Sequence, residues 1–400
     1  MLKFTTNLFT FDRKKFLMLF KEIIGNSTIK QQLIDTVKKN RVSHAQLFFG
    51  NTGNGKLALA LAYAQYLNCE NKTDIDSCGD CSSCFKYKNL SHPDLHLIFP
   101  VLKMPGSKTS TSDNFVNKWR SFVLENPYAS LNDWSEIFDS NNKTGKQFLI
   151  YKDEADVIHQ KLTLKNFESP YRVVLIWMPE KMNLEASNKL LKLFEEPPKG
   201  TIFLLISTSP NKLLPTIISR LQKIKVPDFT KNDILTYLDK SLIDTEKSKK
   251  LIAITGSNLG KILKIESEQL EGLDLFEQFA SWMRLSYKTD IVNISKWVDE
   301  IAFMGRKHQE LFLSYAIKMA RECLIFNFAN HKLLKTNEKE SMFILKFAPF
   351  IHEENSILII DELERSIKSI NRNANAKILF FELSLQIIKF LKVKRKFVIN

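Results

Sequence analysis

Four of the five cysteines in the chain are close together in the sequence, at Cys69, Cys78, Cys81 and Cys84. Two overlapping CxxC pairs and a preceding cysteine offer four thiolates, a set that suits tetrahedral Zn²⁺, and Gly79 relieves the turn between two of them. Four sulfur ligands leave no open position on the metal, so such a zinc ion is structural rather than catalytic. A redox-active CxxC is the competing interpretation, and the additional cysteines favour the metal.

A second group of residues has the pattern of a phosphate-binding loop. GNTGNGK follows the apolar segment AQLFF and precedes the helix-forming LALALAYAQYLN. In such a loop successive backbone N–H groups face phosphate oxygens and the lysine reaches the terminal phosphates. The candidate nucleotide-binding residues are therefore Gly50, Gly53, Gly55 and Lys56.

The residues that should hold a magnesium ion beside this loop are missing. Leu57 stands where a Ser or Thr hydroxyl would bind Mg²⁺. The apolar strand expected at 171–177 ends in Trp177 and Met178 instead of carboxylates, and the first acid is Glu180. Because both metal contacts are lost, the sequence predicts a loop that keeps its fold without hydrolysing ATP, and it leaves open whether ATP or ADP still binds.

Several other polar residues are interpreted structurally. Glu195 and Glu196 end a helix before two prolines, which favours capping or a contact between subunits over catalysis. His92 and His96 are expected to be structural because four cysteines already complete a zinc shell. Cys323 lies in the apolar segment RECLIFNF and is expected in a core.

The order of apolar and helical segments predicts an α/β region followed by an all-α region. Strands are expected at 45–49, 171–177 and 201–208, with helices between them, which implies a mostly parallel sheet. A polar stretch, Met104 to Asn114, is expected to be a mobile loop inside an insertion at about 100–145. Beyond Pro227 the chain is poor in glycine and has helical periodicity to its end.

Composition limits the classes of protein that are possible. The chain has 400 residues, 44% of them hydrophobic, which is enough to bury cores in two or three domains. We expect neither a membrane span nor a secretory signal, and hence a cytoplasmic protein. The net charge of +14 favours a polyanionic partner, although lysine-rich solvated faces would give the same excess.

Longer motifs resemble a known family. HAQLFFGNTGNGK, the cysteine group followed by SHPDL, IWMPEKMNLEASNKLLKLFEEPP and LLPTIISRLQKIKVP occur in the order found in bacterial clamp-loader subunits of DNA polymerase III, and together they look like the delta-prime family. The resemblance covers about Phe20 to Phe229 and extends more weakly to NANAKILFFELSL near the end. Residues 1–17 lie outside it, so Met18 is expected to be the native start.

The resemblance implies roles for individual residues. It implies that the four cysteines bind zinc, and that Ser219 and Arg220 begin a Ser-Arg-Cys motif whose arginine serves the ATP site of a neighbouring subunit. Leu221 replaces the cysteine of that motif. The arginine that senses the γ-phosphate in an active relative would fall near Leu259, a third departure from an active ATPase.

The resemblance also implies an architecture and partners. The partners are clamp-loader ATPase (gamma/tau) subunits and a delta subunit in a five-membered ring, the sliding clamp, and primer-template DNA through the complex, with no autonomous ATPase or polymerase activity. An active gamma/tau-like ATPase subunit and a free-standing zinc-knuckle nucleic-acid-binding protein are the alternatives. The expected fold is α/β plus all-α: an N-terminal extension (1–17), an AAA+ α/β domain (18–226) with a zinc module near 69–84, a helical lid (227–266) and an all-helical oligomerisation, or collar, domain (267–400).

Overall fold

The computed structural model divides the chain into two compact units. The first ends at Phe229 and the second begins at Thr230, with 135–146 counted as part of the second. The N-terminal extension expected at 1–17 lies outside the described residues. The structure describes residues 18–103, 110–138, 147–241, 243, 248, 251–252, 255–267, 275–328, 336, 338–371 and 374–393.

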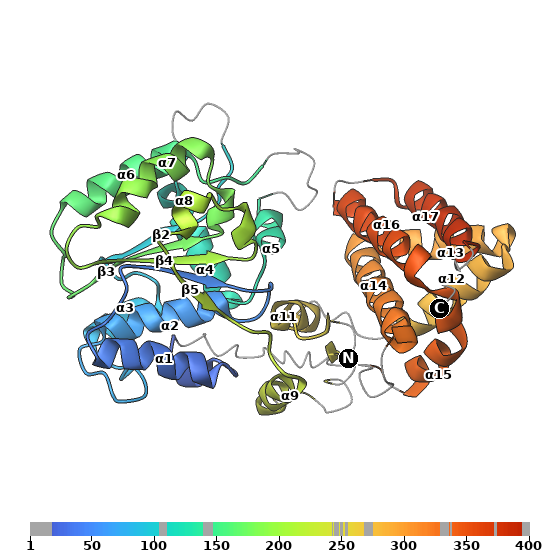
Figure 1. Ribbon diagram of the computed structural model, residues 1–400, viewed down its shortest axis with the longest axis horizontal. Helices are drawn as coiled ribbons and strands as arrows, with labels where there is room; N and C mark the ends of the chain where they lie inside the picture. Colours follow the sequence, from blue (N-terminus) through green and yellow to red (C-terminus); the bar gives the residue numbers. More distant parts are fainter. Residues whose placement is uncertain are drawn as a thin grey trace, which may run out of the picture. The chain divides into compact units, whose positions relative to one another are not determined.

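The first unit is built on a five-stranded sheet in the order β2-β3-β4-β1-β5, with every pairing parallel (Figure 1). Leu47 of β1 lies opposite Leu205 of β4 on one side and Lys223 of β5 on the other. The three predicted strands are confirmed as β1, β4 and β3, and the predicted fold class is confirmed with them. The strands are β1 (Ala45–Phe49), β2 (Leu95–Ile98), β3 (Arg172–Trp177), β4 (Thr201–Ser207) and β5 (Gln222–Lys225).

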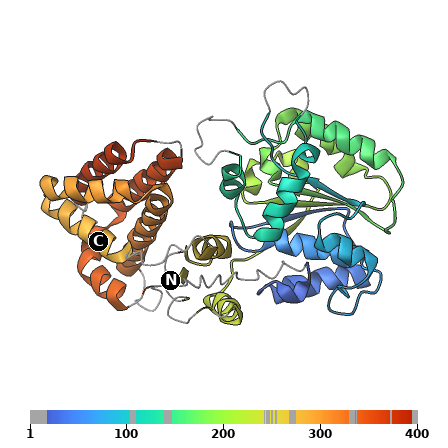
Figure 2. The ribbon, with the colours of Figure 1, turned by 180° about the vertical axis from the view of Figure 1, so that it is seen from behind.

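Helices cover both faces of this sheet, which explains why its inner strands are mostly apolar (Figures 1 and 2). All residues of β3 and β4 are buried. A core of aliphatic and aromatic side chains joins the sheet to α6 and α7. One face carries α1 (Ser27–Lys38), α2 (Lys56–Asn68) and α3 (Ser82–Lys88), and the other carries α6 (Lys152–Thr163), α7 (Leu184–Glu195) and α8 (Pro215–Ile218).

The insertion expected near 100–145 is largely helical and partly buried where it is described. It contains η2 (Ser112–Phe115), α4 (Val116–Glu125) and α5 (Leu131–Glu136). The expectation of a mobile loop is wrong for 110–114. Ser112 is fully buried, and its N–H donates to Glu154 Oε2 at 2.6 Å while its Oγ accepts from the N–H of Phe99 at 3.0 Å. Residues 104–109 lie outside the described part of the chain.

The second unit is helical in its described residues. Its core contains the stacked indoles of Trp282 and Trp297, whose centroids are 5.2 Å apart, and Trp282 Nε1 donates to Ser384 Oγ. The predicted division into a lid (227–266) and a collar (267–400) stays a prediction. The helices are α9 (Lys231–Lys240), α11 (Leu259–Ser267), α12 (Leu275–Lys288), α13 (Ile291–Phe303), α14 (Arg306–Phe328), α15 (Glu338–Phe347), η6 (Ala348–Phe350), α16 (Glu353–Asn371) and α17 (Ala376–Leu391).

In the part of the chain that the structure describes, no helix is both long enough and apolar enough to cross a bilayer.

Candidate metal centre and phosphate loop

The four predicted cysteines converge on one point. Cys69 follows the last residue of α2, Cys81 is the N-cap of α3, and Cys84 lies inside α3. Their Sγ atoms all lie within 4.8 Å of one another. The Sγ of Cys78 is 3.5 Å from that of Cys69 and 3.8 Å from that of Cys84. Zinc–sulfur bonds of about 2.3 Å in a tetrahedron put the sulfurs roughly 3.8 Å apart, so these four donors fit a zinc ion.

Backbone N–H groups donate hydrogen bonds to three of the cysteine sulfurs, which favours the thiolate form of these side chains. The N–H of Cys78 donates to Cys69 Sγ at 3.3 Å, that of Cys81 to Cys78 Sγ at 3.4 Å, and that of Cys84 to Cys81 Sγ at 3.4 Å. Burial opposes ionisation of Cys78, yet donation from the N–H groups of Asp80 and Cys81 helps to lower its pKa to about 6. Burial raises the pKa of Cys84 far above its usual value. A metal would convert all four into thiolates and release their protons.

The two nearby histidines have other partners. His92 Nδ1 accepts from the N–H of Asp94 at 3.1 Å, and its Nε2 lies 3.0 Å from Ser169 Oγ. Burial lowers the pKa of His92, so the ring is neutral and carries its proton on Nε2. Burial lowers the pKa of His96, in β2, to about 4. Both therefore act as neutral structural side chains, separate from the cysteine cluster.

The phosphate-type loop has the backbone conformation that its glycines allow. Gly55, the N-cap of α2, has φ +82°, and a Cβ at Gly50 would lie 2.3 Å from the carbonyl oxygen of Val226. Neither position accommodates a larger residue without strain. Gly53 also has positive φ. The loop thus joins β1 to α2 in the way that the sequence predicts.

Polar groups of the loop already have partners within the chain. Lys56 Nζ donates to the carbonyl oxygen of Asn51 at 2.7 Å, and the Lys56 N–H donates to Asn54 Oδ1 at 3.3 Å. Burial lowers the pKa of Lys56 to about 8, against the charges of Glu180 and Asp228. Asn54 is a residue whose role the sequence did not reveal. Its side chain also donates to Val226, which fixes the loop to the end of β5.

Aromatic packing closes the carboxyl end of β3, where metal-binding carboxylates would be expected. Trp177 is 2% exposed, and its ring centroid is 6.2 Å from that of Trp119 and 6.1 Å from that of Phe122, both on α4. Leu57 is 4% exposed. Glu180 Oε1 accepts from the N–H and the hydroxyl of Thr208, both at 2.9 Å, so this acid is held at the end of β4.

The insertion also reaches the phosphate loop. A Cβ at Gly55 would lie 2.8 Å from a ring carbon of Phe229 and 3.2 Å from one of Tyr128, which follows α4. The two rings contact each other with centroids 6.1 Å apart. No sequence pattern indicated that the insertion would pack here, because its aromatic residues have no fixed spacing from the glycines.

Arg220 lies two residues beyond α8, on the surface of the first unit. Its guanidinium forms an ion pair with Glu195, the last residue of α7, and its Nη1 donates to the carbonyl oxygen of Thr216 at 2.6 Å and to Ser219 Oγ at 3.2 Å. Leu221 is buried in the core of the first unit. Glu195 is therefore a partner of Arg220 in the isolated chain. In the second unit, Leu259 is fully buried at the start of α11.

Comparison with known proteins identifies a family for most of the first unit. The family model described as "DNA polymerase III, delta subunit" matches residues 25–230. The chain belongs to this family, which confirms the clamp-loader resemblance.

Curated relatives include two kinds of DNA polymerase III subunit. The chain is 28% identical to subunit delta' of Bacillus subtilis over 49% of its own length and 46% of the relative. It is 28% identical to subunit delta' of Pseudomonas aeruginosa over 60% and 58%. It is also 28% identical to subunit tau of Bacillus subtilis over 57% and 32%. The chain thus spans about a third to three fifths of the length of these relatives.

Proposed function

We propose that the chain is a delta-prime-type subunit of a DNA polymerase III clamp loader that does not itself hydrolyse ATP. Its partners in this proposal are gamma/tau ATPase subunits, a delta subunit, the sliding clamp and, through the complex, primer-template DNA in the cytoplasm. The relatives include both delta' and tau subunits at equal identity. The choice between them therefore rests on the chemistry of the nucleotide site.

The observation that carries the proposal is the packing of aromatic side chains at the carboxyl end of β3. An ATPase needs an oxygen ligand for Mg²⁺ beside the phosphate loop and a carboxylate that positions metal or water. Here Leu57 and Trp177 are both buried apolar side chains, and Trp177 packs on α4. A carboxylate introduced at this point would lose hydration among aromatic side chains. These features support a chain that has the fold of a tau subunit but does not hydrolyse ATP.

We infer that the cysteine cluster holds one structural Zn²⁺. Cys69, Cys78, Cys81 and Cys84 would hold it, and the ion would supply a fourfold cross-link between the end of α2 and the start of α3. The distances between sulfurs and the three N–H donors to sulfur support this assignment. With four protein ligands the ion has no position for a substrate.

Arg220, together with Ser219, is proposed to act in trans on the ATP site of a neighbouring subunit. Its side chain is 35% exposed, so it can reach a partner, and a guanidinium grips two phosphate oxygens in one plane. The ion pair with Glu195 holds the side chain at the surface before assembly. The exposed pair is weak enough to be exchanged for a γ-phosphate.

ATP turnover provides the test. The isolated chain is expected to hydrolyse no ATP above background with Mg²⁺, while a ring assembled with gamma/tau and delta subunits hydrolyses ATP when DNA is added. Turnover by the isolated chain that disappears in a Lys56→Ala variant would assign the chain to the active ATPase class instead. Nucleotide binding without turnover is compatible with the proposal, since the loop keeps its conformation.

A further inference from the structure

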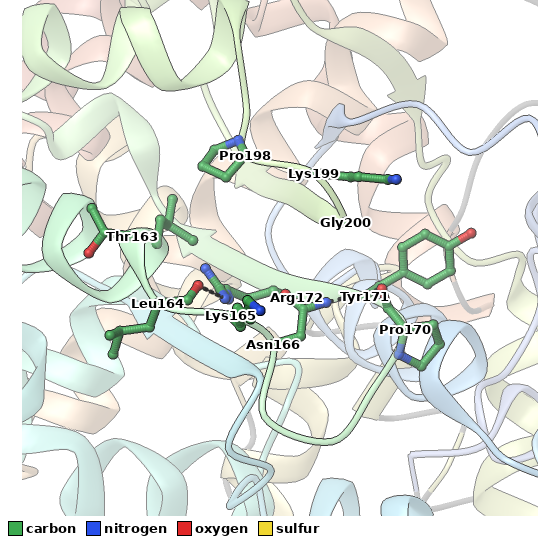
Figure 3. A pocket seen from close by; sticks show the side chains of 11 residues that line it. Thr163, Leu164, Lys165, Asn166, Pro170, Tyr171, Arg172, Pro198, Lys199 and Gly200 are labelled. Carbon is green, nitrogen blue, oxygen red and sulfur yellow. Dashed lines mark hydrogen bonds between the residues drawn. The ribbon is translucent and has the colours of Figure 1, made fainter.

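The cysteine module, defined as residues 69–88, makes a set of contacts with a loop that follows it by about eighty residues. This loop, 164–171, connects α6 to β3 and is defined here as the coupling loop. Its Leu164 and Phe167 side chains are 70% and 78% exposed. Figure 3 shows Leu164 and Lys165 on one side of a groove whose other side is formed by Pro198, Lys199 and Gly200.

Side chains of α3 and α2 hold the middle and the C-terminal end of the coupling loop. Lys86 Nζ donates to Glu168 Oε1 at 2.7 Å. Asn68, next to the ligand Cys69, donates from Nδ2 to the carbonyl oxygen of Tyr171 at 2.8 Å and accepts from the Tyr171 N–H at 3.2 Å. The same Nδ2 donates to the hydroxyl of Tyr87 at 2.8 Å. The loop is thus bound to Asn68, next to Cys69, and to Lys86, two residues after Cys84.

The SHPDL segment, which begins at Ser91, three residues after the end of the module, fixes the middle of the loop. Asp94 accepts from three successive N–H groups, those of Phe167, Glu168 and Ser169, at 2.7, 2.9 and 3.0 Å. His92 contacts Ser169 through Nε2, and its ring lies 4.7 Å from the ring of Tyr87 on α3. The position of Tyr87 therefore affects the histidine that supports the loop.

Helix α3 has little stability of its own. It has seven residues, and isolated helices shorter than about 12–15 residues are marginal in water. Among its side chains only Ser83, Cys84 and Tyr87 are buried, and Phe85 is 65% exposed. Two of the four thiols lie at its N-cap and in its first turn, so a bound metal would anchor the start of the helix in addition to the buried Tyr87.

From this arrangement we propose that metal binding at the four cysteines positions the coupling loop. The metal fixes α3, and α3 fixes the loop through Lys86, Tyr87 and the ring of His92. The ion would thereby determine how Leu164 and Phe167 are presented to solvent. This inference rests on the proposed zinc site and assigns that site a task beyond local folding.

The same module also holds the start of the described chain. Asp76, between the first two cysteines, accepts from the N–H groups of Phe20 at 3.0 Å and Lys21 at 2.9 Å. Leu19 lies against Gly79, since a Cβ there would be 3.6 Å from Leu19 Cδ1. Residues 19–21 thus provide a second segment whose order should follow the metal.

Amide hydrogen exchange, measured on the full chain with and without zinc, tests the inference. On chelation we expect amides of Phe167, Glu168 and Ser169 to exchange about tenfold faster or more, because local opening becomes easier. Amides of β4 and of α12 to α14 should keep their rates. Cys81→Ser should reproduce the effect, and Cys323→Ser, which alters a buried cysteine of the second unit, should not.

Zinc content separates failure of the site from failure of the inference. If one zinc binds per chain and its removal leaves exchange in the coupling loop unchanged, the positioning role is wrong and the metal site stands. If no zinc binds, both are wrong. Asp94→Asn provides a second route: it should speed exchange of the same three amides while zinc stays bound, whereas unchanged exchange would contradict the role given to Asp94.

Discussion

Replacing Arg220 by Ala is expected to slow DNA-stimulated ATP turnover of an assembled ring. In the isolated chain Arg220 pairs with Glu195, and their side chains are 35% and 44% exposed. Exposed pairs of this kind contribute about 0.2–1 kcal/mol, so releasing the arginine costs at most ~1 kcal/mol. Arginine fingers raise phosphoryl-transfer rates by about 10³ to 10⁵, or roughly 4–7 kcal/mol. The free energy gained from the contact in trans therefore exceeds the cost of breaking the ion pair with Glu195.

A coupled ATPase assay on rings of verified mass provides the measurement. If one of three ATP sites loses its arginine and the sites act independently, turnover falls by about a third, and by more if the sites cooperate. Glu195→Gln removes the competing partner, so turnover at the site that Arg220 serves should stay equal or rise by up to about fivefold. Lys189→Ala, which removes another exposed ion pair of the first unit, should have no effect. Normal turnover in the Arg220→Ala ring would refute the reasoning.

Three further predictions concern the isolated chain. Cys84→Ser should abolish zinc binding in elemental analysis, whereas Cys323→Ser should retain one zinc; the opposite result would refute the ligand assignment. Burial raises the pKa of Glu154 from 4.5 to about 7, so the folded state holds this proton more tightly than the unfolded chain. The free energy of unfolding, measured in urea, should therefore fall by a few kcal/mol between about pH 4.5 and pH 7. Glu154→Gln should remove that decrease, and a variant with the same pH profile as the unmodified chain would contradict the prediction. Introducing both Leu57→Thr and Trp177→Asp should lower the free energy of unfolding by ~3 kcal/mol or more without producing ATPase activity. The reason is that an indole packed between aromatic rings is replaced by a buried charge. A stable variant that hydrolyses ATP would show that the site lacks only the side chains that bind Mg²⁺.

Features encoded locally were predictable from the sequence. The cysteine spacing and the glycine loop depend on nearby residues, and both have the expected geometry. The strands β1, β3 and β4 were predicted because parallel strands buried on two faces are nearly continuous apolar runs. β2 and β5 were missed. Each has four residues, and β5 is mostly exposed and contains Lys223 and Lys225, so neither gives a clear strand signal.

Features that depend on long-range packing were not predictable. The insertion was expected to contain a mobile loop because 104–114 is polar, but Ser112 is buried through hydrogen bonds to Phe99 and Glu154. Likewise, the sequence indicates Asp94 only as a member of the SHPDL motif. Its function, to bind three N–H groups of a loop more than seventy residues away, depends on the pairing of β2 with β3. Periodicity and composition carry no information on such contacts.

The mass of the complex that the chain forms with gamma/tau and delta subunits tests the central claim most directly. Size-exclusion chromatography with light scattering, performed on the mixed purified subunits, should give one species with the mass of a ring that contains a single copy of this chain. The account predicts that omitting the chain prevents this species from forming. A chain that elutes alone at 46.4 kDa, while the other subunits assemble without it, would contradict the proposal.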